Sequence, residues 1–136
     1  NYWDYSRRNS PSILLNNYYE GADGNIYIRD LEKATFTNCI IDGALSTEIS
    51  FQEESGKYNY TFDHCLIKLD PTIDTNSNNY INVIINESPY FLDKNTNDFH
   101  LTDQSPAIDA GVGPSTNDIE GNPREKPDIG AFEFQN

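Results

Sequence analysis

The residues best suited to chemistry in this chain of 136 residues are four carboxylates and one arginine near the C-terminus. They are Asp109, Asp118, Arg124, Asp128 and Glu133. Most glycoside hydrolases use a pair of carboxyl groups, one as an acid and the other as a base or nucleophile. The same residues also suit a structural role, in which Arg124 forms charge-assisted hydrogen bonds with one or more of the acids and holds the C-terminal segment in place.

Aromatic residues near the N-terminus are candidates for ligand contact. They are Tyr2, Trp3, Tyr5 and Tyr18. An aromatic ring is large, apolar and flat, and its face suits the apolar face of a pyranose sugar. In the alternative interpretation the N-terminal aromatic residues cover the open end of the fold, and the neighbouring Tyr19 lies in the core.

A polar loop offers oxygen ligands at alternating positions, a pattern that can hold Ca²⁺. The residues concerned are Asp70, Asp74, Asn76 and Asn78. The spacing lacks the glycine and the bidentate glutamate of an EF-hand loop. We therefore assign no metal ligand and no cofactor, and Ca²⁺ is the one cofactor that the sequence leaves open.

A repeated apolar segment indicates how the chain is built. Asn16, Asn38, His64 and Asn86 occupy the third position of similar apolar segments and are separated by 22, 26 and 22 residues. A period in this range is typical of chains that stack one supersecondary unit on the next. Asn and His tolerate the left-handed backbone conformation of a kink between strands. We therefore expect these four residues to form a ladder of turns along one edge of the stack.

The same alignment predicts the core and the position of the two cysteines. The expected columns of stacked side chains are Leu14, Phe36, Phe62 and Ile84 in one and Tyr19, Ile41 and Ile67 in the other. Cys39 and Cys65 occupy equivalent positions of neighbouring repeats, about 4.8 Å apart on adjacent strands. That separation allows a disulfide, but side chains pointing the same way suit a bridge poorly. Two stacked buried thiols are the alternative.

The composition limits the classes of partner. Acidic residues number 22 and basic residues 9, for a net charge of −13, and apolar residues make up 36%. Such a surface repels nucleic acid and anionic membranes. No run of about 18 apolar residues predicts a membrane-spanning helix. We expect a secreted or cell-surface protein without membrane insertion, with polysaccharide as its partner and its oligomeric state open.

The C-terminal segment carries three motifs that resemble a known group of proteins. They are Asp98-Phe99-His100-Leu101, then Ser105-Pro106-Ala107-Ile108-Asp109-Ala110-Gly111, and finally Asp128-Ile129-Gly130-Ala131-Phe132-Glu133. The pattern resembles the C-terminal signature of right-handed parallel β-helix surface proteins of Bacteroidetes, which have pectate-lyase-like coils and a choice-of-anchor type tail. The resemblance implies an all-β, right-handed parallel β-helix of about four coils in residues 1–87. Residues 88–136 would then be its C-terminal capping segment, which favours the structural role of the acidic residues.

For function, the resemblance implies a non-catalytic C-terminal portion of a secreted or cell-surface protein associated with complex carbohydrate. Two alternatives stay open. The chain is either the C-terminal end of a polysaccharide lyase or glycoside hydrolase whose catalytic residues lie upstream, or a structural adhesin stalk. We assign no catalytic residue and expect no enzyme activity from this part.

Overall fold

The computed structural model describes residues 8–114 and 116–135, and this part of the chain is all-β. The candidate ligand residues Tyr2, Trp3 and Tyr5 therefore lie outside the described residues. The elements are β1 (Ile13–Asn16), β2 (Tyr18–Glu20), β3 (Ile26–Ile28), β4 (Leu31–Thr37), β5 (Ile40–Ile41), β6 (Ile49–Gln52), β7 (Tyr58–Asp63), β8 (Leu66–Ile67), β9 (Tyr80–Ile81), β10 (Ile84–Ile85), β11 (Phe91–Asp93), the 3₁₀ turn η1 (Lys94–Thr96) and β12 (Asp98–Leu101). Among the described residues, no helix has the length and apolar character needed to span a membrane.

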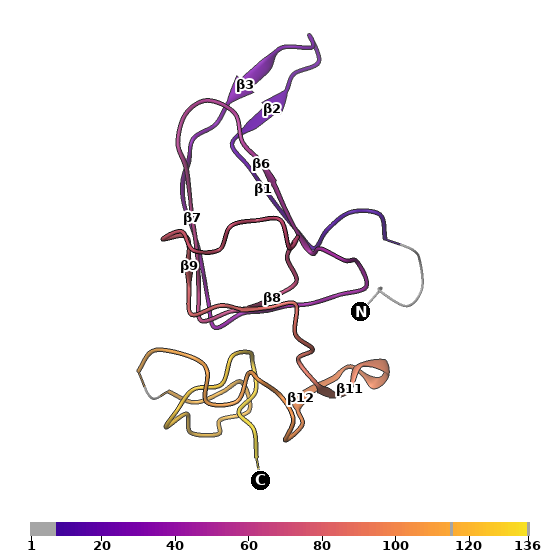
Figure 1. Cartoon of the computed structure of the whole chain (residues 1–136), viewed down its shortest axis with the longest axis vertical. Coiled ribbons are helices and arrows are strands. Elements are labelled where there is room, and N and C mark those ends of the chain that lie inside the picture. Colours follow the sequence, from indigo (N-terminus) through magenta and orange to yellow (C-terminus); the bar gives the residue numbers. More distant parts are fainter. Residues whose placement is uncertain (1–7, 115, 136) are drawn as a thin grey trace.

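Three parallel sheets make up the strand stack, which we define as residues 13–85. Their strand orders are β1–β6, β4–β7–β9 and β5–β8–β10. Every pair joins a strand to its equivalent further along the chain, in parallel. Figure 1 shows the three sheets as the sides of a roughly triangular outline. The chain thus visits the three sheets in the same order in its first two passes, and its third pass returns only to the β4–β7–β9 and β5–β8–β10 sheets.

The observed register corrects part of the expected one. Phe36 pairs with Phe62, as expected, but Phe62 pairs with Tyr80, only 18 residues later, instead of with Ile84. Leu14 belongs to a different sheet, where it pairs with Ser50, and its side chain is 51% exposed. The alignment failed because the last pass of the chain round the outline, from β8 onward, contains fewer residues than the pass before it.

The core of the stack is a column of aromatic rings. Phe62 is fully buried and lies between Phe36 and Tyr80, with ring centroids 4.7 and 5.8 Å away and the rings nearly parallel. Ile41 and Ile67, which were expected in a common column, are register partners and belong to the same buried cluster. Stacking equivalent side chains on adjacent strands is the cross-strand pairing that stabilises sheets.

Tyr19 was expected in the core, and this expectation was wrong. Strands β2 and β3 form an antiparallel hairpin between β1 and β4, and Figure 1 shows it extending away from the triangular outline. Tyr19 lies on this hairpin and is 46% exposed. The segment Tyr18–Glu20 resembles the repeated segments in sequence but pairs with β3 instead of stacking.

The tail, which we define as residues 88–135, does not cover the end of the stack. It contains the antiparallel pair β11–β12 followed by irregular chain. The outward-facing side of the β5–β8–β10 sheet packs against it, in a cluster formed by Ile40, Leu66, Ile84, Phe91, Leu101, Ala107, Ile108, Ala110, Ile129 and Phe134. Figure 1 shows the tail beside the outline, below β8. The segment that was expected to cap the end of the stack therefore covers one of its sides instead, the outer face of the β5–β8–β10 sheet.

Candidate functional site

The expected ladder of turn residues is observed at two of its four positions. Asn38 and His64 precede β5 and β8 with φ angles of 53° and 49°. The third member of this column is Asn82, with a φ of 48°, because Ile84 pairs with Leu66. Asn82 Nδ2 lies 3.0 Å from His64 Nε2, and His64 Nδ1 lies 2.6 Å from Asp63 Oδ1. This chain of side chains accounts for His64 as a structural residue.

Asn16 and Asn86 lie elsewhere, so their assignment to the ladder was wrong. Asn16 ends β1 and donates from its amide to the Tyr18 carbonyl. Asn86 follows β10, and its side-chain amide accepts from the Leu69 N–H and donates to the Leu69 carbonyl, both at 2.9 Å. Asn86 also has a positive φ, of 59°, but in a separate turn. The alignment assumed that the turn residue follows Ile84-Ile85, and it therefore selected Asn86. In the structure Ile84-Ile85 pairs with the strand that follows His64, so the true equivalent of His64 is Asn82, which precedes the pair.

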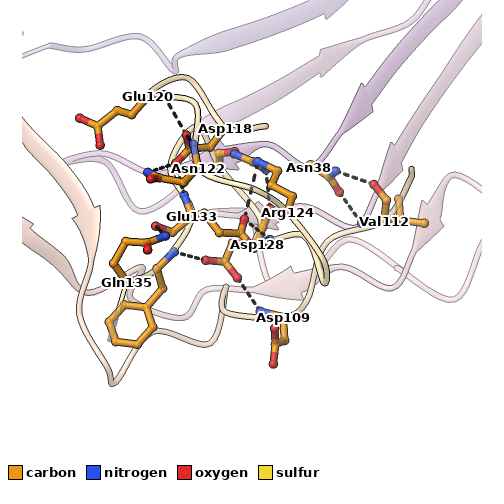
Figure 2. Close-up of polar contacts among 12 residues, drawn as sticks. Asn38, Asp109, Val112, Asp118, Glu120, Asn122, Arg124, Asp128, Glu133 and Gln135 are labelled. Carbon is orange, nitrogen blue, oxygen red and sulfur yellow. Dashed lines mark hydrogen bonds and ion pairs between the residues drawn. The ribbon is translucent and has the colours of Figure 1, made fainter. Parts of the chain in front are cut away.

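Asp118, Asp128 and Glu133, which we call the tail acids, direct side-chain oxygens to backbone N–H groups (Figure 2). Asp128 is 2% exposed, and its two oxygens accept from the N–H groups of Asp109 and Phe134 at 2.7 and 2.6 Å. Asp118 accepts from the N–H groups of Glu120, Asn122 and Glu133. Although burial acts in the opposite direction, these hydrogen bonds hold the pKa of Asp118 below its usual range.

Arg124 is nearly buried and joins two parts of the tail. Its guanidinium donates to the carbonyls of Asp128 and Gly130 at 3.1 and 2.9 Å, and its Nε lies 3.6 Å from Glu133. Burial raises the pKa of Glu133. The side chain of Asp109 lies outside this network and approaches Lys126 at 3.7 Å instead. Asp118 and Asp128 are thus engaged by backbone groups, whereas Asp109 and Glu133 line a second, smaller pocket of about 330 Å³ together with Lys126.

The loop considered for Ca²⁺ uses its acidic oxygens within its own turns. Asp70 Oδ1 accepts from the backbone and hydroxyl of Thr72, and Asp74 Oδ1 accepts from the backbone and amide of Asn76. Among residues 8–114 and 116–135, no group of three or more His, Cys, Asp and Glu side chains is placed to hold a metal ion.

The β2–β3 hairpin presents an ordered aromatic cluster that the sequence interpretation missed. Tyr19 and Tyr27 are cross-strand partners whose rings stack with centroids 5.2 Å apart and an angle of 15° between their planes. The guanidinium carbon of Arg29 lies 5.0 Å from the Tyr19 centroid, a cation–π contact. We call Tyr19, Tyr27 and Arg29 the hairpin cluster. Two short strands flanking Gly21-Ala22-Asp23-Gly24 were the signal that could have revealed it.

Polar contacts fix this hairpin at both ends. At the tip, Asp23 accepts from the Tyr27 hydroxyl at 2.7 Å and from Asn25, and these bonds lower the pKa of Asp23 to about 2. At the base, Asn17 is fully buried and exchanges hydrogen bonds with the loop after β6, including one from the Glu54 N–H at 2.8 Å. Tyr18, on the opposite face of the hairpin, is half-buried and pairs with Ile28. These contacts hold the hairpin in place, and with it the exposed side chains of Tyr19 and Tyr27.

A cavity of about 690 Å³ lies between β5 and the tail. The tail contributes Phe91, Phe99 and Phe132 to its wall, and Arg8 and Asp42 line it as well. Arg8 also binds Glu48, a fully buried acid that accepts from Ser12 and Leu45. The residues that line this cavity are far apart in the sequence, so no local motif predicts it.

The exposed aromatic residues of the hairpin cluster are therefore held in a fixed geometry. The cavity between β5 and the tail is the main concave site in the described part of the chain. The tail acids and the loop at residues 70–79 are occupied by their own backbone contacts. Comparison with protein-family models, with curated proteins and with solved structures finds no match to this chain.

Proposed function

We propose that this chain is a non-catalytic part of a secreted or cell-surface right-handed parallel β-helix protein, and that it contacts complex carbohydrate through the hairpin cluster. The β-helix is supported by the three parallel sheets and by the repeated strand order round a triangular outline. The non-catalytic role is supported by the tail acids, whose oxygens are engaged by backbone N–H groups.

The observation that carries the carbohydrate proposal is the exposure of ordered tyrosines on a hairpin that projects from the stack. Tyr19 and Tyr27 are 46% and 38% exposed although their rings stack on each other. Stacked rings already have most of their rotamer freedom removed, so binding a ligand costs little additional entropy. Arg29 Nη2, 3.3 Å from the Tyr19 hydroxyl, adds a hydrogen-bond donor beside the rings.

Charge selects the class of glycan. The whole chain carries a net charge of −13, so a polyanionic glycan is repelled at long range. A neutral polysaccharide has no such penalty and presents both hydroxyls and apolar ring faces. We therefore expect neutral glycans as ligands, bound without a cofactor.

A panel of immobilised neutral and uronate-containing polysaccharides tests the proposal. We expect the chain to bind at least one neutral member, and Tyr19→Ala to weaken that binding at least tenfold, which corresponds to about 1.4 kcal/mol. Tyr90→Ala is the matched control, because Tyr90 is equally exposed, at 46%, but lies on the tail. Chelation of divalent cations should leave binding unchanged.

Two results would contradict this assignment. Failure to bind any member of the panel would favour the structural stalk. Equal loss in Tyr19→Ala and Tyr90→Ala would place the ligand away from the hairpin.

A further inference from the structure

The two cysteines are neighbours on adjacent strands and differ in exposure. Cys39 precedes β5, at the edge of its sheet, and Cys65 precedes β8, at the centre. Their backbones are in register, because Ile40 pairs with Leu66. Cys65 is fully buried, whereas Cys39 is partly exposed, and both are free thiols. An outer thiol therefore lies directly beside an inner one.

Hydrogen bonds connect the two residues and separate their chemistry. The Cys39 N–H approaches Cys65 Sγ at 3.5 Å, and each sulfur lies 3.3 Å from a backbone carbonyl, that of Thr37 for Cys39 and that of Phe36 for Cys65. The neighbouring Cys65 thiol lowers the pKa of Cys39 to about 6. The same contact, together with burial, raises the pKa of Cys65. The thiolate, which is the nucleophilic form, is thus favoured at the exposed partner.

We propose that Cys39 is a site of thiol–disulfide exchange with small-molecule disulfides, and that Cys65 resolves the resulting mixed disulfide. The Cys39 thiolate attacks one sulfur of a disulfide such as glutathione disulfide, the S–S bond breaks, and the first glutathione leaves as a thiolate that takes up a proton. Cys65 then attacks the Cys39 sulfur, and its proton passes to the departing glutathione thiolate. The second glutathione leaves, so two protein thiols are oxidised and one disulfide is reduced to two thiols.

The fold permits the second step. Adjacent strands lie about 4.8 Å apart, inside the range of Cα separations found in disulfides. Because the two cysteine side chains point the same way, they must turn toward each other to form the bond. Strand β5 can shift to allow this, because it pairs with another strand on one side only. Cys39 also belongs to the wall of the cavity beside β5, which gives a reagent a path to this end of the sheet.

Incubation of the full chain with glutathione disulfide, followed by acid quench and intact-mass analysis, tests the proposal. The wild type should lose both thiols and retain no glutathione. Cys65→Ser should stop at one glutathione adduct, located on Cys39 by peptide mapping. Cys39→Ser should react at least tenfold more slowly than Cys65→Ser, because its remaining thiol is buried.

A second measurement keeps the test decisive if a serine variant fails to fold. Brief alkylation of the folded wild type with iodoacetamide should label Cys39 at least tenfold faster than Cys65. Equal labelling of the two cysteines would overturn the proposal, as would a wild type that keeps both thiols or one that accumulates a glutathione adduct as stable as that of Cys65→Ser.

Discussion

The strand stack and the tail are stabilised by different means. In the stack, backbone groups pair with the next strand and the interior is a column of rings centred on Phe62. In the tail, regular pairing ends after β12, and buried acids such as Asp128 and Asp118 bind the backbone N–H groups instead. Buried N–H groups need partners whichever way the chain folds. A repeated fold supplies them through strands, and an irregular one through individual side chains.

The two regions meet at a sheet that is apolar on both faces. Ile67 points into the stack, and its neighbour Leu66, only 1% exposed, is covered by the tail. The tail therefore replaces water over the outer face of β5, β8 and β10. Substitutions on either side of this sheet show whether the regions depend on each other.

The largest effect is expected from Phe62→Ala. Phe62 is fully buried between two other rings, so truncation removes its transfer energy and leaves a cavity, at a cost of about 3–5 kcal/mol in the free energy of unfolding. Urea unfolding followed by circular dichroism measures this loss. Phe36→Ala, in the edge strand of the same column, should cost less because Phe36 is only half-buried. Equal losses would show that the edge position is packed as fully as the central one.

A smaller and more local effect is expected from Asp128→Ala. The substitution leaves the partly buried N–H groups of Asp109 and Phe134 without their acceptor, at a cost of about 1–3 kcal/mol. Amide hydrogen exchange should accelerate in the tail and much less in β7 and β8. Asp109→Asn is the control, because it removes the same charge from an exposed carboxylate that approaches Lys126, and Asn tolerates the φ of 57° at this position. Uniform acceleration across the chain would show that the two regions unfold as one unit.

The sequence predicted the features that depend on local backbone chemistry. Asn38 and His64 were identified because few residue types tolerate a positive φ. The all-β class and the pairing of Phe36 with Phe62 followed from apolar segments repeated at a similar spacing. These features need only the chain nearby and one neighbouring repeat.

The features that failed depend on where segments pack. In the doublets Ile40-Ile41, Leu66-Ile67 and Ile84-Ile85, only Ile41, Ile67 and Ile84 were placed in the core, although consecutive apolar residues indicate a strand covered on both sides. That signal would have placed the tail beside the sheet. The β2–β3 hairpin was missed because Tyr18-Tyr19-Glu20-Gly21 resembles a repeat, and the turn residues between it and Ile26–Ile28 were not read as a hairpin signal.

The smallest effect is expected from the pH dependence of a contact within the tail. His100 Nδ1 lies 2.6 Å from Asp98, its Nε2 lies 3.1 Å from Glu120, and its ring packs on Phe132. The hydrogen bonds to Asp98 and then Glu120 raise the pKa of His100. Its charged form is therefore favoured in the folded state, so its contribution is complete below about 6.5, the pKa of an unfolded histidine, and is lost as pH rises through the folded pKa.

An NMR titration of the His100 ring, with melting temperatures measured across the same pH range, checks this last prediction. The titration midpoint should lie above about 6.5 in the wild type and should fall in Glu120→Gln. Glu125→Gln is the matched control, because it removes one negative charge from an exposed position of the same tail. The melting temperature should decline slightly with rising pH, and the decline should be smaller in Glu120→Gln. The effect is small because His100 and Glu120 are largely accessible to water, with side chains 37% and 51% exposed, and solvent screens their attraction. If the midpoint falls equally in both variants, the general acidity of the chain raises the pKa of His100, and the contact between β12 and Glu120 adds nothing to the stability of the tail.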